Sequence, residues 1–128
     1  MALVLRLVFA LIPLLAAAPA PAAQKGTATS PTYADIRVTW QAEAGKTGGT
    51  VVHGYVHNGR SSPIRSVHLQ VESLGPGGQV LAKGIEHVRP GMGPGGRTYF
   101  EIPLRAGGAD YRVTILSVDF QWRDDRRW

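Results

Sequence analysis

Apolar and polar residues alternate along most of the chain after residue 32. A period-two pattern of this kind predicts strands with one buried and one solvated face. It predicts strands at 33–40, 50–57, 64–74, 79–88, 97–104 and 111–122. The side chains expected to face the core are Ile36, Val38, Trp40, Val52, Gly54, Val56, Val67, Leu69 and Val71. In the last strand the apolar phase changes near Ile115 and Leu116, which predicts a bulge or burial on both faces.

Clusters of glycine and proline separate these segments, and the chain holds 16 glycines and 9 prolines in 128 residues. Such punctuation favours short strands joined by turns over long helices. Six or seven strands in one sheet would leave an apolar face in water, so two packed sheets are expected. We therefore predict an all-β fold, an immunoglobulin- or fibronectin-III-like β-sandwich of six to seven antiparallel strands in two sheets, over residues 33–122.

Short motifs along the predicted domain resemble the FxLYD-type domains of exported bacterial proteins. The matching runs are GYVHNG at 54–59, PI at 63–64, VHLQV at 67–71, GQV at 78–80, RPG at 89–91 and FEIP at 100–103. The likeness spans roughly residues 36–117, and VESLG stands at 71–75 where the family has its name-giving motif. The resemblance implies an immunoglobulin-like fold and no catalytic residues.

The first 22 residues have the pattern of a signal peptide. Arg6 is followed by an apolar stretch at 7–15, and small residues at Ala20 and Ala22 favour cleavage after Ala22, or alternatively after Ala20. An uncleaved anchor is the other interpretation, but the apolar stretch is shorter than the roughly 20 residues that a spanning helix needs. We expect an exported protein, periplasmic or secreted, with no transmembrane anchor after cleavage. Residues 23–32 are expected to be a flexible linker.

The composition and the short motifs of the chain exclude several kinds of catalysis and binding. The chain has no cysteine, so disulfides, thiol catalysis and a lipid-modified cysteine are excluded. Its formal charge is +5, but the arginines are scattered, and export makes nucleic acid an unexpected partner. The sequence GKT at 45–47 and the glycines at 91, 93 and 96 lack the strand-to-helix context of nucleotide-binding loops. With no nucleophile motif either, we predict a protein that is not an enzyme and has no cofactor.

Histidines are the candidate metal ligands. His53 and His57 would lie about 13 Å apart along one strand, too far to share an ion. If 50–57 and 64–73 paired as a hairpin, His53 would stand opposite His68, with Glu72 nearby as a third ligand. Polar residues on the wet face of a sheet explain the same pattern without a metal.

The C-terminal tail, residues 123–128, is charged and continues from Trp122. We name its candidate interaction residues as Trp122, Arg123, Arg126, Arg127 and Trp128, because tryptophan and arginine are favoured at binding hot spots. A frayed terminus is the alternative.

The sequence thus predicts a non-enzymatic interaction or structural module of the envelope. An envelope protein would be its partner, held on a sheet face, at an exposed edge or by the tail. The alternative function is a periplasmic metal- or small-ligand-binding protein that uses His53, His57, His68 or His87. A hydrolase is a third interpretation.

Overall fold

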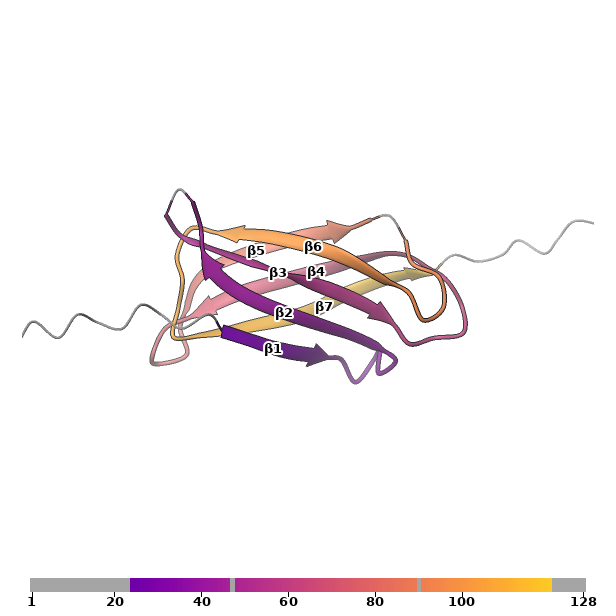
Figure 1. Ribbon diagram of the computed structural model, residues 1–128. Coiled ribbons are helices and arrows are strands. Elements are labelled where there is room, and N and C mark those ends of the chain that lie inside the picture. The colour runs from indigo at the N-terminus through magenta and orange to yellow at the C-terminus, as the bar shows by residue number, and fades with distance from the viewer. Residues whose placement is uncertain (1–23, 47, 90, 121–128) are drawn as a thin grey trace, which may run out of the picture.

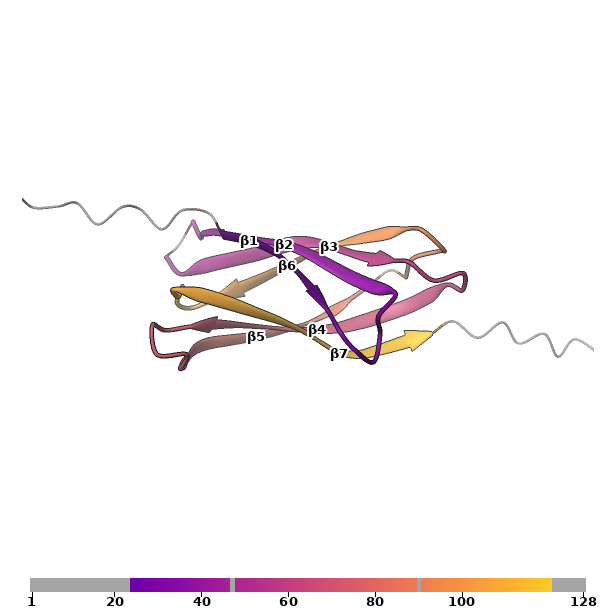
Figure 2. The ribbon, with the colours of Figure 1, turned by 90° about the horizontal axis from the view of Figure 1, so that it is seen from below.

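The structure is a computed structural model that describes residues 24–46, 48–89 and 91–120. Seven antiparallel strands form two sheets that lie face to face, as Figures 1 and 2 show. The strands are β1 (Gln24–Thr29), β2 (Ile36–Ala44), β3 (Thr50–Asn58), β4 (Ile64–Leu74), β5 (Val80–Val88), β6 (Arg97–Leu104) and β7 (Asp110–Phe120). The predicted all-β sandwich is confirmed.

One sheet has the order β1-β2-β3-β6 and the other the order β5-β4-β7. Chain-adjacent strands pair as hairpins within a sheet at β1–β2, β2–β3 and β4–β5. The β4–β5 turn needs Gly78, whose φ of 80° is a conformation that favours glycine. The chain crosses between the sheets after β3, after β5 and after β6, so each sheet is built from distant parts of the sequence.

The core lies between the sheets and follows the predicted alternation. Every side chain that the pattern assigned to the core is buried. The largest of these is Trp40, which stands beside Gly26 on β1 and Gly54 on β3. A Cβ atom on Gly26 would lie 2.7 Å from the Trp40 ring, and one on Gly54 would collide with the β2 backbone. Gly26 therefore makes room for the indole, and Gly54 lets the backbones of β2 and β3 approach closely.

The linker predicted at 23–32 is wrong for the residues that the structure describes. Gln24–Thr29 forms β1 and pairs with β2 over its whole length, from Gln24 opposite Ala42 to Thr29 opposite Arg37. The polar, small composition of this segment is typical of a linker, but an edge strand needs only its backbone to pair. Ala28 packs against the core and supplies the small apolar contact that β1 makes.

The predicted change of phase in the last strand is confirmed as a bulge. In the β4–β7 pairing His68 stands opposite Ser117, and the next residue of β4, Leu69, stands opposite Ile115. Leu116 is the extra residue and is 44% exposed, whereas Ile115 is buried. The bulge keeps the following inward positions of β7 on the core side.

Asn58 joins two loops at one end of the sandwich. Its side chain is buried, and its amide nitrogen donates to the carbonyl oxygens of Ser62 at 2.9 Å, Gly93 at 3.1 Å and Met92 at 3.3 Å. Its amide oxygen accepts a hydrogen bond from the backbone N–H of Arg60 at 2.9 Å. The loop after β3 and the loop before β6 are thus held by one side chain.

Two predicted segments lie outside the described residues. They are the signal peptide at 1–22 and the C-terminal tail at 123–128. The predicted interaction residues also lie outside the described residues: they are Trp122, Arg123, Arg126, Arg127 and Trp128.

Candidate functional site

The hairpin that would place His53 opposite His68 does not form. His53 lies on β3 and His68 on β4, and these strands belong to opposite sheets. The short connection between them crosses the sandwich instead of turning back, and Ile64 at the start of β4 pairs its backbone with Met92. Among residues 24–46, 48–89 and 91–120, no group of three or more His, Asp or Glu side chains is placed to hold a metal ion.

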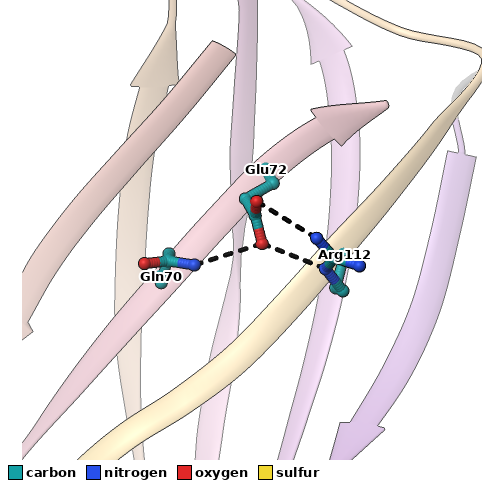
Figure 3. Close-up of polar contacts among 3 residues, drawn as sticks. All are labelled: Gln70, Glu72 and Arg112. Carbon is teal, nitrogen blue, oxygen red and sulfur yellow. Dashed lines mark hydrogen bonds and ion pairs between the residues drawn. The ribbon is translucent and has the colours of Figure 1, made fainter. Parts of the chain in front are cut away.

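Glu72, the third predicted ligand, is engaged by its neighbours on the outer face of β4 (Figure 3). Arg112 Nε donates to its Oε1 at 3.0 Å and Arg112 Nη2 to its Oε2 at 3.2 Å, while Gln70 Nε2 donates to Oε1 at 3.1 Å. The hydrogen bond from Arg112 lowers the pKa of Glu72. The carboxylate is thus a partner of Arg112 that bridges β4 and β7.

His68 instead faces His87, directly opposite on β5. Their rings stack with centroids 4.0 Å apart and planes 9° from parallel. Ser117 Oγ lies 3.1 Å from His68 Nδ1, and His87 Nε2 is buried without a hydrogen-bond partner among the described residues. Burial and then the neighbouring His68 lower the pKa of His87. This ring pair is the only stacked one among the described aromatic contacts.

Sequence reasoning missed this pair because a bulge separates it from the turn. The turn of the β4–β5 hairpin pairs Leu74 with Val80, and equal counts outward from there would place His68 opposite Glu86. A register shift between Ser73 and Leu74 moves the pairing by one residue and brings His68 opposite His87. The glycine-rich turn alone indicates a hairpin but not this register.

The outer face of the four-stranded sheet carries exposed aromatic rings. Tyr55 and Tyr99 are direct neighbours on β3 and β6, with ring centroids 5.6 Å apart in an edge-on arrangement. The guanidinium of Arg97 lies 4.2 Å from the centre of the Tyr55 ring. Tyr99 donates to Glu101 at 3.3 Å, and its pKa is raised by burial and then by that carboxylate.

Charge on this face is divided between its two ends. At one end His57 stands in register between Arg37 and Arg97, and its Nε2 lies 2.9 Å from Thr39 Oγ1. Burial, then Arg37 and Arg97, lowers the pKa of His57. At the other end His53 Nε2 lies 3.2 Å from a Glu43 oxygen. The titratable groups thus pair with one another across an open sheet surface.

The surface hollows among the described residues are open grooves. One runs over Gly26, Trp40 and Gly54 beside Tyr55, and another lies at the end of the sandwich next to Leu81. A third brings together Glu43, His53, Tyr99 and Glu101, whose side chains already bind one another as the two pairs above.

The β5 strand is an edge strand that exposes several large apolar side chains. It has a hydrogen-bonded neighbour, β4, on one side only, within the described residues. Val80, Leu81 and Ile85 on this strand are 49%, 46% and 56% exposed. They account for three of the five large exposed apolar side chains of the described residues, the others being Tyr99 and Leu116.

No known protein family, curated protein or solved structure matches this chain. No helix long and apolar enough to cross a membrane occurs among the described residues.

Proposed function

We propose that this protein is a non-enzymatic interaction module that acts outside the cytoplasm and binds an extended segment of an envelope protein by strand addition at β5. The observation that carries this proposal is the edge of β5, which exposes apolar side chains and has no hydrogen-bonded neighbour on that side among the described residues, although β6 of the other sheet packs against it at Gly84. An edge strand presents unpaired N–H and C=O groups that can pair with another chain. Exposed apolar side chains next to them add contact area and specificity.

The other edges carry features that oppose pairing. β6 has Pro103, which lacks an N–H donor, and charged side chains at Arg97 and Glu101. β7 is interrupted by two register shifts along β4. β1 is short and exposes polar side chains. The β5 strand has nine residues, no proline, and a single irregularity near its start.

The side chains of β5 indicate what kind of segment fits. Lys83 and Ile85 point to the outer face with Glu72 and Gln70 as their neighbours on β4. A segment paired on the open side would place its own side chains beside Lys83 and Ile85 on the same face. We expect an extended sequence with an acidic residue next to Lys83 and an apolar residue next to Ile85.

The test places a photo-cross-linking amino acid at residue 85 of the full chain in the producing cell. The matched control carries it at residue 116, because Leu116 is similarly exposed but lies on the bulged edge of β7. We expect a cross-link to an envelope protein from residue 85 and none from residue 116. A peptide copied from the cross-linked segment should then slow hydrogen exchange of β5 amides in the purified protein.

The variants Ile85→Lys and Leu116→Lys complete the design. Ile85→Lys should weaken binding of that peptide at least tenfold, and Leu116→Lys should leave it unchanged. A cross-link from residue 85 to a second copy of this chain would contradict the proposal, because the edge would then serve self-association. Equal loss in both variants, or no added protection of β5, would contradict it as well.

Export is part of the same proposal. Cleavage after Ala22 would leave β1 whole, since β1 begins at Gln24. The chain would then be periplasmic or secreted and not a lipoprotein, as the lack of cysteine requires. The resemblance to FxLYD-type domains agrees with an immunoglobulin-like module of this kind. Mass spectrometry of the protein from the envelope fraction should find Ala23 at its N-terminus, and an intact Met1 would contradict export by cleavage.

A further inference from the structure

The stacked histidines of β4 and β5 are a second feature, separate from the open edge. We propose that His68 and His87 bind one divalent transition-metal ion, Zn²⁺ or Cu²⁺, on the outer face of the β5-β4-β7 sheet. Imidazole nitrogen is a preferred ligand of these ions. This inference does not rest on strand addition.

The spacing of the rings suits a shared ion. Two nitrogens bound to one ion at about 2.0–2.1 Å each can be at most about 4.2 Å apart. His68 and His87 stand directly opposite each other on β4 and β5, with ring centroids 4.0 Å apart, so one nitrogen of each ring can reach a shared ion. The rings are stacked 9° from parallel, and each would have to turn out of the stack so that its nitrogen lone pair points at the ion.

The surroundings of each ring also suit a ligand role. Ser117 Oγ contacts His68 Nδ1, which leaves Nε2 of that ring as the nitrogen for the ion. Histidine ligands commonly have their other nitrogen hydrogen-bonded in this way, which fixes the ring. His87 Nε2 has no hydrogen-bond partner among the described residues. Rotation of His87 toward an ion would give this ring a polar partner.

The remaining ligands would be water molecules. Glu72 is held by Arg112, and Glu86 and Asp119 act on His87 through their charge without a direct contact. Two protein ligands make a site of modest affinity, so its occupancy would follow the free concentration of the ion. The paired position on two strands means that a bound ion would cross-link β4 to β5.

The experiment measures thermal unfolding of the full chain with Zn²⁺ and, as the control ion, Mg²⁺. A ligand that binds the folded state raises Tm. We expect saturating Zn²⁺ to raise Tm by about 5 °C or more, and Mg²⁺, which prefers oxygen ligands, to leave it unchanged. The shift should vanish in His68→Gln and in His87→Gln. It should persist in the matched control His53→Gln, on the other outer face.

A spectroscopic measurement separates a paired site from single histidines. Electron paramagnetic resonance of one equivalent of Cu²⁺ should report two imidazole nitrogens in the wild type and one in either single variant. A Zn²⁺ shift that survives in the His68→Gln/His87→Gln double variant would overturn the proposal, as would one nitrogen per Cu²⁺ in the wild type. Ile85→Lys should keep the metal signal, so failure here and failure of strand addition are distinguishable.

Discussion

Two edge strands, β5 and β6, lie on the same side of the sandwich (Figure 1). They differ in which side chains they bury and which they expose. They are in contact, since the space at Gly84 of β5 is filled by the Ile102 side chain of β6. β6 buries Phe100, Ile102 and Leu104 and exposes polar residues, Pro103 and the ring of Tyr99. β5 buries little and leaves Ile85 more than half exposed.

The difference concerns what the apolar side chains of each strand contribute. On β6 the apolar side chains that face the other sheet are buried in the core, so stability explains them. On β5 Val88 is buried, but Val80, Leu81 and Ile85 do little for the core, so stability does not explain these three. An apolar residue on an exposed edge is a liability that proteins usually remove, which favours a binding role for β5.

The largest expected effect compares isoleucines on the two edges. Ile102 is 2% exposed and Ile85 is 56% exposed. Ile102→Ala should lower the free energy of unfolding by about 2–5 kcal/mol, because it leaves a cavity in the core. Ile85→Ala should change it by less than about 0.5 kcal/mol. Urea unfolding of both variants measures this, and similar losses in the two would show that β5 is as stabilising as β6.

The next effect concerns the contact between the edges. A Cβ atom at position 84 would lie 2.6 Å from Cγ2 of Ile102, which is fully enclosed in the core. Gly84→Ala should therefore lower the free energy of unfolding by about 1–3 kcal/mol through overpacking. The matched control is Gly93→Ala, where a Cβ would meet nothing within 4 Å. A stable Gly84→Ala protein would mean that β5 can move away from β6 without loss.

The smallest expected effect is a change in the pKa of His57, which lies between Arg37 and Arg97 in the sheet that contains β6. Burial first, then Arg37 and Arg97, lowers the pKa of His57, so the folded protein resists protonation that the unfolded chain accepts below about pH 6.5. The stability due to neutral His57 is present above that pH and is lost as the pH falls through the lowered pKa. Arg97→Gln should raise the pKa of His57 in an NMR titration. Arg65→Gln, a change on the other sheet, should not alter it.

Much of the fold could be predicted from the sequence, because the core strands alternate strictly. Val67, Leu69 and Val71 reveal their buried face without any knowledge of their partners. The β1 strand could not be found in this way. Its stability comes from backbone pairing and from the fit of Gly26 against Trp40, and neither leaves an apolar pattern in the segment.

The candidate site was harder to predict because it depends on which strands are neighbours. His53 and His68 were paired on the assumption of a hairpin, whereas the chain crosses to the other sheet between them. The apolar residues of β5 indicated a strand, but alternation alone cannot tell a buried apolar face from an exposed one. Only the sheet order reveals that Ile85 lies on an open edge.

The hydrogen bonds of Asn58 have a consequence for the chemical ageing of the protein. Asn58 precedes Gly59, and an asparagine before glycine is prone to cyclise on the following backbone nitrogen and lose its amide as ammonia. The amide nitrogen of Asn58 donates to three carbonyl oxygens, so the folded chain holds the side chain away from that reaction. If deamidation did occur in a transiently unfolded molecule, the resulting carboxylate could not donate to those carbonyls. Such a molecule would refold poorly, so deamidated protein would accumulate with the total time that chains spend unfolded.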